Sequence, residues 1–143
     1  MKKRISVAAL ISACVIVGMV SLYPVTALAS NTIVGVSSKW LNLQTISMNM
    51  SYSGTGVTWN ATMLGKANTV SMTASATLDK KNSSGTYANV ATWSSFSTAG
   101  QTLSASGSTA TSKGTYRLTV TVSVTSSSGT TETVSNSLEK TFS

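Results

Sequence analysis

The sequence predicts an all-β protein: an antiparallel β-sandwich of about seven strands, preceded by a signal peptide. Apolar residues alternate with Ser and Thr through much of the chain beyond residue 45, and no stretch shows the spacing of a helix. Polar segments that contain Gly interrupt this alternation at short intervals, as turns between strands do. The N-terminal segment differs from the rest, because it is first basic and then continuously apolar.

The N-terminal segment predicts a Sec signal peptide over residues 1–29. Met1–Arg4 carries three basic residues, and Ile5–Leu22 is almost wholly apolar. Pro24 and the small-residue site Ala27–Ala29 follow, so cleavage is expected after Ala29. Cleavage leaves about 114 of the 143 residues and lowers the formal net charge from +7 to about +4. The protein is therefore expected to be secreted, and to be extracellular or associated with the cell wall.

Two other interpretations of this segment stay open. Ile5–Leu22 approaches the length of a membrane span, so it could remain uncleaved as an anchor. Ile11–Cys14 loosely matches a lipidation site, and Cys14 would then carry a lipid. The apolar run continues beyond Cys14 to Val20, which favours the signal peptide over lipidation. Apart from this segment, no contact with a membrane is expected.

The remaining chain is expected to form one domain over residues 45–143. It contains no Cys, and a chain of about a hundred residues buries enough surface to fold without a disulfide. Residues 30–44 are the least regular part, and two interpretations of them are open. They form either a loosely packed leader or a first edge strand.

Seven alternating segments are expected to form the strands of this domain. Ser53–Gly56 and Ser126–Gly129 are the clearest turns between them, because Gly supplies the backbone freedom that a tight turn needs. Asp79–Gly85 is also expected to be a turn, rich in charge. The strands are expected at residues 46–52, 57–63, 70–78, 86–94, 101–105, 113–125 and 130–142.

Two of these segments differ in the clarity of their pattern. In residues 113–125, Tyr, Leu and Val occupy every second position, so one face is apolar and the other carries hydroxyl groups. In residues 86–94 the pattern is weaker, because Tyr87, Ala91 and Trp93 share one face while Val90 lies on the other. Weakly apolar strands suit the edges of a sheet. We therefore expect residues 113–125 to lie at the centre of the sandwich.

The segment Gly114–Leu118 resembles the G-x-Y-x-C signature that opens strand F of immunoglobulin-like domains. The resemblance implies structural roles for Gly114 and Tyr116 at the corner before the strand, with the Tyr116 hydroxyl bonded back to nearby backbone. Leu118 stands where the signature has its disulfide Cys. A seven-stranded sandwich of about 100 residues is the immunoglobulin-like plan, so the expected fold is an immunoglobulin-like β-sandwich.

The chain is also similar to a group of small, uncharacterised secreted proteins of Gram-positive bacteria. The similarity covers residues 57–142 and depends on short motifs built from common strand residues. The resemblance implies an immunoglobulin-like fold, and it transfers no activity and no site residue. The motifs are Leu78–Lys81, Gly85–Tyr87, Val90–Trp93, Gly114–Leu118 and Glu132–Val134.

The residue types present argue against most enzyme chemistry. The chain has no His and the mature part has no Cys, so the usual general base, thiol nucleophile and zinc ligands are missing. Glu132 and Glu139 lie at an odd separation on one strand, which places them on opposite faces. Asp79 lies in the expected charged turn. No catalytic residue, metal ligand or cofactor is therefore expected, and the protein is expected not to be an enzyme.

Trp40 is the candidate ligand contact, because aromatic rings bind sugars by stacking and this residue lies outside the clear strands. Trp59 and Trp93 lie within alternating segments, which favours the core for both. The basic residues lack interleaved aromatic residues, so nucleic acid is not an expected partner.

The hypothesis from the sequence is a secreted, non-catalytic interaction module of unknown ligand, outside the cell or at its surface. A cell-wall glycan and a surface protein are the candidate partners, and a carbohydrate-binding module is the sharper version of this hypothesis. The alternative is a cationic secreted effector that acts on the membrane or the cell wall.

Overall fold

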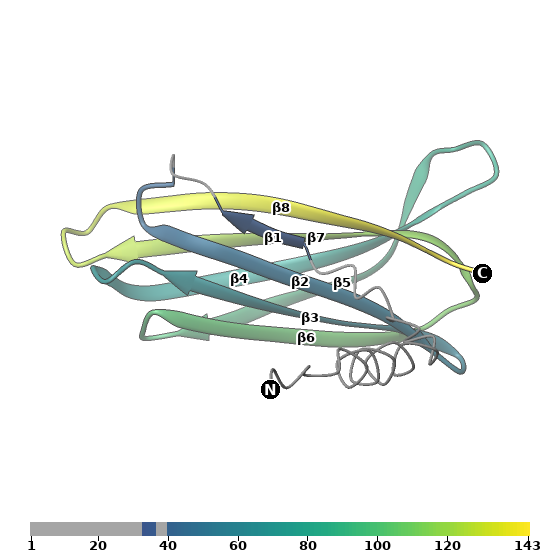
Figure 1. The fold of residues 1–143 in the computed structure, drawn as a ribbon, viewed down its shortest axis with the longest axis horizontal. Coiled ribbons are helices and arrows are strands. Elements are labelled where there is room, and N and C mark those ends of the chain that lie inside the picture. Colours follow the sequence, from purple (N-terminus) through teal and green to yellow (C-terminus); the bar gives the residue numbers. More distant parts are fainter. Residues whose placement is uncertain (1–32, 37–39) are drawn as a thin grey trace, which may run out of the picture. The chain divides into compact units, whose positions relative to one another are not determined.

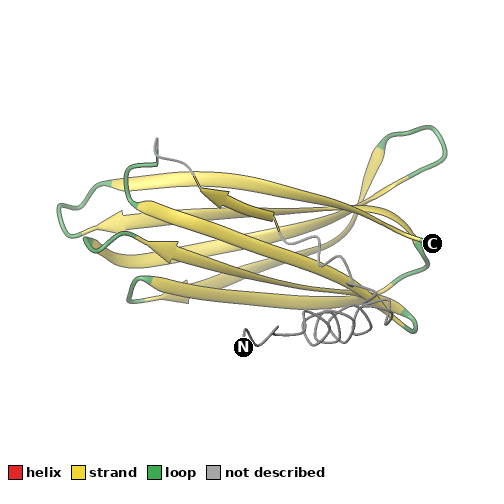
Figure 2. Ribbon diagram, in the orientation of Figure 1, coloured by secondary structure: helices red, strands yellow, loops and turns green. Residues whose placement is uncertain are grey.

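The computed structural model describes residues 33–36 and 40–143, and every regular element in this part is a β-strand. Figure 1 shows the strands in chain order, and Figure 2 shows the turns and loops that join them. The predicted signal peptide and Cys14 lie outside the described residues. No helix among the described residues has the length and hydrophobicity to span a membrane. The strands are β1 (Ile33–Val36), β2 (Leu43–Ser53), β3 (Gly56–Gly65), β4 (Thr69–Lys81), β5 (Tyr87–Thr98), β6 (Thr102–Ala110), β7 (Gly114–Ser126) and β8 (Thr131–Phe142).

The strands form two antiparallel sheets, which confirms the predicted all-β class and two-sheet arrangement. The first sheet has the order β1-β2-β3-β6, and the second has the order β5-β4-β7-β8. The seven long strands, β2 to β8, each overlap one of the seven expected segments. The short β1 pairs with β2 at the edge of the first sheet, from Ile33↔Met48 to Val36↔Thr45.

The core lies between the two sheets and is supplied by every second residue of the strands. Strand β7 lies between β4 and β8, and its inward-facing side chains are fully buried, as the alternation predicts. Strands β2, β3 and β4 contribute four buried Met side chains, whose flexible thioethers fill irregular gaps well. The buried residues of β7 are Tyr116, Leu118, Val120, Val122 and Val124, and the core Met residues are Met48, Met50, Met63 and Met72.

Strand β5 departs from strict alternation, so the predicted faces of this strand are wrong for Val90, which faces the core, and for Tyr87, which faces outward. Its pairing with β4 shifts register twice, and each shift inserts an extra residue into β5 as a bulge. Val90, Trp93 and Phe96 consequently all pack against the core, at a spacing of three. Val90 therefore shares a face with Trp93, whereas simple alternation places it on the opposite face.

The turn between β4 and β5 is shorter than predicted, which is a second correction. Strand β4 continues through Asp79 to Lys81, and β5 begins at Tyr87, so only residues 82–86 form the turn. Asn82 closes this turn, because its Oδ1 accepts a bond from the Thr86 N–H at 3.0 Å. The hairpin extends away from the body of the second sheet in Figure 1.

A regular row of paired hydroxyl groups runs along β7 and β8 on the outer face of the second sheet. Each pair joins directly opposite residues of the two strands. A hydroxyl has one donor and two acceptor positions, so each pair keeps capacity for a further partner. The pairs are Thr115–Thr141 (2.9 Å), Thr119–Ser137 (2.9 Å), Thr121–Ser135 (2.7 Å), Ser123–Thr133 (2.8 Å) and Thr125–Thr131 (3.0 Å).

Candidate ligand-binding site at the basic end

Most of the described basic residues lie together at one end of the sandwich, which we call the basic end. It is formed by the β2–β3 turn, the β4–β5 hairpin, the β6–β7 loop and the C-terminal part of β8, which lie at the right of Figure 1. Lys66, in the β3–β4 turn, lies at the opposite end. The topology therefore gathers residues that are far apart in the sequence: Lys80, Lys81, Lys113, Arg117 and Lys140.

Three charged residues form one row across the outer face of the second sheet at this end. Asp79 of β4 lies opposite Arg117 of β7, and Arg117 lies opposite Glu139 of β8. Arg117 Nη2 is 3.8 Å from Glu139 Oε2, and the two side chains are 42% and 50% exposed. The prediction that Asp79 lies apart in a turn is wrong, because β4 continues through it. We call Asp79, Arg117 and Glu139 the charged row.

Tyr87 of β5 covers the charged row. The Arg117 guanidinium carbon lies 3.7 Å from the centre of the Tyr87 ring, a stacked cation–π contact. The Tyr87 hydroxyl donates a hydrogen bond to Glu139 Oε2. This bond, partial burial and the Glu139 charge raise the pKa of Tyr87 above its ordinary value of 10.0, although Arg117 opposes them. The Tyr87 hydroxyl is therefore protonated at neutral pH and can donate this hydrogen bond. The bond holds the Tyr87 ring against Arg117.

Lysines at the basic end join its loops to one another. Three ammonium groups each donate to a carbonyl oxygen of another segment, and Lys80 also donates to Ser112 Oγ. An ammonium has three donors, so each of these lysines keeps at least one. Lys81 differs, because its side chain is exposed and its Nζ lies 5.8 Å from the centre of the Tyr87 ring. The three carbonyl pairs are Lys80 with Ser112 (3.2 Å), Lys113 with Ser143 (2.6 Å) and Lys140 with Met50 (2.9 Å).

Gly114 and Tyr116, the predicted structural residues, lie where β7 begins. Tyr116 is fully buried, and its hydroxyl donates to the Ser112 carbonyl and pairs with Thr111 Oγ1 at 2.8 Å. Gly114 has a φ of 154°, and a Cβ atom there would lie 2.8 Å from Lys80 Cε. The two residues therefore shape the β6–β7 loop beside the site.

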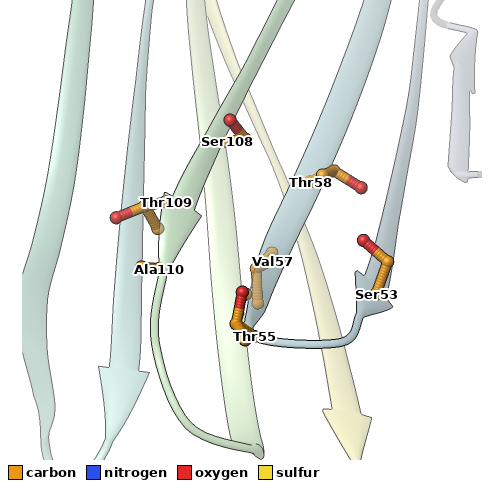
Figure 3. A pocket seen from close by; sticks show the side chains of 8 residues that line it. Ser53, Thr55, Val57, Thr58, Ser108, Thr109 and Ala110 are labelled. Atoms are coloured by element: carbon orange, nitrogen blue, oxygen red, sulfur yellow. The ribbon is translucent and has the colours of Figure 1, made fainter.

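A hydroxyl-lined hollow of about 220 Å³ lies at the basic end on the first sheet. Figure 3 shows that its lining comes from the β2–β3 turn, from β3 and from the end of β6. Its lining includes no charged side chain, so it offers hydrogen bonds and apolar contacts but no ion pair. The lining residues are Ser53, Thr55, Gly56, Val57, Thr58, Ser108, Thr109 and Ala110.

A second hollow, of about 350 Å³, lies on the outer face of the second sheet, beside a bulge of β5. At this bulge Ser95 has a φ of 73°, an uncommon conformation for a residue other than Gly. Thr121 and Ser123 line the hollow and also belong to the hydroxyl row of β7 and β8. The outer face therefore offers hydroxyl groups continuously from this hollow to Arg117.

Trp40, the predicted ligand contact, lies at the end opposite to the basic end. Its side chain packs partly buried against the core, and its carbonyl accepts a bond from Lys66 Nζ. Nearby, the Glu132 carboxylate accepts hydrogen bonds from the backbone N–H groups of residues 41–43, at 2.8, 2.8 and 3.2 Å. Trp40 is thus part of a firmly bonded segment, and the fold does not bring it to the charged row.

Trp59 and Trp93 are in tilted contact with one another between the sheets. Their ring centres are 5.2 Å apart, with an angle of 60° between the planes. Trp59 is buried, as predicted, whereas Trp93 is only half-buried. Gly107 of β6 lies against both rings, because a Cβ atom there would be 2.6 Å from Trp59 Nε1 and 2.7 Å from Trp93 Cε2.

Sequence reasoning missed Tyr87 and the charged row, although a register argument finds part of it. The β7–β8 turn is centred near Ser128, and a hairpin about that centre places Arg117 opposite Glu139. The contact of Tyr87 with Glu139 has no such signal, since β5 and β8 are the opposite edges of their sheet. This contact depends on the bulge at Val90, which places Tyr87 on the outer face of the sheet.

The basic end presents a planar cation, a phenol, carboxylates and hydroxyl groups on an open surface. Groups of this kind bind polar, hydroxylated or anionic ligands through hydrogen bonds and ion pairs. In the described part of the chain, no three acidic, His or Cys side chains gather to hold a metal ion. No family model matches the chain, and no match is found among the curated proteins or the solved structures.

Proposed function

We propose that the protein is a secreted, non-catalytic interaction module that binds an anionic cell-wall glycan. The ligand lies on the outer face of the second sheet, with its anionic groups at the basic end. The observation that carries this proposal is the stacking of Tyr87 on Arg117 within the charged row. Beside this row, the hydroxyl pairs of β7 and β8 supply donors and acceptors for the sugar hydroxyls.

Arg117 is suited to recognise an anionic group of the ligand. A guanidinium binds a carboxylate or a phosphate through two parallel hydrogen bonds. Its ion pair with Glu139 is half-exposed and 3.8 Å long, so a ligand anion displaces Glu139 at small cost. Tyr87 holds the guanidinium plane in place, which reduces the conformational entropy that is lost on binding.

An immunoglobulin-like fold is part of the proposal and is supported by the strand order. Strands β2, β3 and β6 follow the order of strands A, B and E, and β5, β4, β7 and β8 follow the order of strands C′, C, F and G. Tyr116 stands near the start of the strand that corresponds to F, and its hydroxyl bonds back to Ser112 as a tyrosine corner does. Sandwiches of this plan use their faces and end loops for binding.

Secretion is supported by the basic, apolar and small-residue regions of residues 1–29. A secreted chain meets the anionic polymers of a cell wall directly. The N-terminal sequence of the protein recovered from culture medium or cell wall tests this step, and it is expected to begin at Ser30. A chain that begins at Cys14 and carries a lipid, or an intact N-terminus in the membrane fraction, would contradict it.

Binding to purified cell walls tests the proposed ligand. Binding is expected to weaken as salt rises, and to disappear when the anionic polymers are stripped from the walls. Arg117→Ala is expected to weaken binding by about tenfold or more, through loss of a charge-assisted bidentate contact. Arg117→Lys keeps the charge but loses the planar fork, so an intermediate loss is expected.

Trp40→Ala is the control for the position of the site. It alters an aromatic residue at the end opposite to the charged row, so binding is expected to stay at the wild-type level. Wild-type binding by Arg117→Ala would remove the charged row from the site. Loss of binding in Trp40→Ala alone would move the site to the other end of the sandwich.

A cationic effector that acts on membranes is the second candidate function. The gathering of five basic residues at one end favours it, because such a surface attracts anionic lipid headgroups. Leakage from anionic vesicles that falls as salt rises would support this function. Intact vesicles at low salt would exclude it.

A further inference from the structure

Strand β6 presents a free edge of the first sheet. It spans nine residues, Thr102–Ala110, rather than the five expected from the sequence, and within the described chain it pairs only with β3. The bonds from Gly65 N to Gln101 O and from Thr111 N to Thr55 O show that the odd-numbered residues of this segment bond to β3. In an antiparallel ladder, the even-numbered residues of β6 then direct their backbone N–H and C=O groups away from β3.

The edge of β6 lacks the features that protect the edges of the second sheet. Strand β5 is bulged at two places, and β8 carries Glu132, Glu139 and Lys140. Strand β6 contains no charged residue and no Pro, and its pairing with β3 has no register shift. A continuous, uncharged edge of this kind is a template for a further strand.

The sequence of β6 is nearly symmetric about Ser106. Ser104 and Ser108 lie two residues to either side, and the small residues Ala105 and Gly107 lie between. Antiparallel pairing with a second β6 about this centre places each Ser104 opposite a Ser108. Such a pair forms roughly ten backbone hydrogen bonds. The Ser side chains of the two β6 strands then lie opposite one another. Hydroxyl side chains of β7 and β8 are paired in the same way, as in Thr121 and Ser135, whose hydroxyl oxygens are 2.7 Å apart.

Charge also favours a second copy in this orientation. The Ala110 end of β6 lies at the basic end, and the Thr102 end lies at the opposite end. An antiparallel pair therefore sets the basic end of each copy beside the less basic end of the other. Trp93 is half-buried against Gly107 and lies beside this edge. Pairing with β6 of a second copy would bury more of its ring.

We propose that two copies of the chain associate by antiparallel pairing of their β6 strands, so that their first sheets form one continuous sheet. This proposal does not depend on the glycan proposal, because the interface is on the first sheet and the charged row is on the second. The outer face of the second sheet remains free, so the dimer presents two charged rows.

Sedimentation equilibrium tests the dimer over protein concentrations from micromolar to millimolar. The sample is the chain in the form that its host produces. The wild type is expected to sediment as a dimer. Ser106→Lys places two like charges directly opposite each other and is expected to sediment as a monomer. Ser135→Lys is the matched control, because it makes the same change on the outer face of the edge strand β8, and it is expected to remain a dimer.

Mixing two folded variants separates a lost interface from a lost fold. Ser106→Lys and Ser106→Glu are each expected to be monomeric, and a mixture of the two is expected to form a heterodimer through opposite charges. Thermal unfolding shows that each variant is folded. A monomeric wild type at all concentrations, a dimeric Ser106→Lys, an equal effect of Ser135→Lys, or a mixture that stays monomeric would each overturn the proposal.

Discussion

Strand β8 carries one glutamate at each end of the sandwich, and the protein uses the two in different ways. Glu132 faces inward and accepts hydrogen bonds from three successive backbone N–H groups at the start of β2. Glu139 faces outward at the basic end, half-exposed, where it contacts Arg117 and Tyr87. Their opposite faces follow from their odd separation on one strand, as the sequence predicts.

Glu132 stabilises the fold because the backbone of the chain holds it, whereas Glu139 is exposed and accessible to the proposed ligand. Burial by itself would raise the pKa of Glu132, but bonds from Asn42, Leu41 and Leu43 and the charge of Lys66 lower it below its ordinary value. The acceptor positions of Glu132 are thus occupied by the chain itself. Within the described chain, the Glu139 carboxylate instead forms polar contacts only with the side chains of Arg117 and Tyr87, so the proposed ligand can replace it beside Arg117.

Glu132→Ala should cause a large loss of stability, greater than that of Glu139→Ala or Gly114→Ala. It leaves three backbone N–H groups without their acceptor, so the free energy of unfolding is expected to fall by about 2–4 kcal/mol. Urea unfolding measures the change. Glu139→Ala is the control on the same strand and should change the free energy of unfolding by less than about 1 kcal/mol, as an exposed ion pair does. Equal effects of the two substitutions would remove the distinction between them.

Acid should weaken the Glu132 end specifically. Because the folded-state pKa of Glu132 lies below its value in the unfolded chain, its contribution is complete above the unfolded pKa and is lost as pH falls through the folded pKa. The melting temperature of the wild type is therefore expected to fall below about pH 4.5, while that of Glu132→Gln falls less. The gap between the two proteins should close as pH decreases. A constant gap at every pH would contradict this account.

The same contrast between the two ends explains what the sequence could predict. Period-two alternation reports which side chains face the core, so it located β7, its buried residues Val120 and Val122, and the opposite faces of Glu132 and Glu139. These features depend on local geometry alone. Alternation does not report where a strand carries an extra residue, and the bulge at Val90 reversed the expected faces of Val90 and Tyr87 relative to Trp93.

The charged row depends on contacts between strands that are distant in the sequence. Arg117 and Glu139 belong to one hairpin, so their pairing could be predicted from the register about its turn. Asp79 joins them only because β4 continues past the expected turn, and Tyr87 joins them only because a bulge of β5 turns it to the outer face. Neither event leaves a signal in the order of apolar and polar residues. Trp40, in contrast, was selected for its residue type, and the fold places it at the other end.

Gly114→Ala should cause a smaller loss of stability, at the basic end. The φ of 154° at this residue is one that side chains rarely adopt, and the new Cβ atom would meet Lys80 Cε at 2.8 Å. The end of a Lys side chain can move, so the backbone conformation dominates, and a loss of about 1 kcal/mol is expected from urea unfolding. Gly100→Ala is the control, because its Cβ atom would have Thr98 Oγ1 at 3.7 Å as its nearest neighbour. A larger effect at Gly100 would mean that the β6–β7 loop is not constrained at Gly114.

Glu139→Gln should have the smallest effect on stability and a distinct effect on titration. The substitution removes the negative charge that faces Tyr87 and weakens the hydrogen bond that its hydroxyl donates. The pKa of Tyr87 is therefore expected to fall toward 10.0, because Arg117 still lowers it and burial is left as the main cause that raises it. An ultraviolet titration of the tyrosines measures the shift, and Tyr87→Phe identifies which transition belongs to this residue. An unchanged Tyr87 transition in Glu139→Gln would mean that the phenol and the carboxylate are not in contact, and the charged row would then lose the residue that holds Arg117 in place.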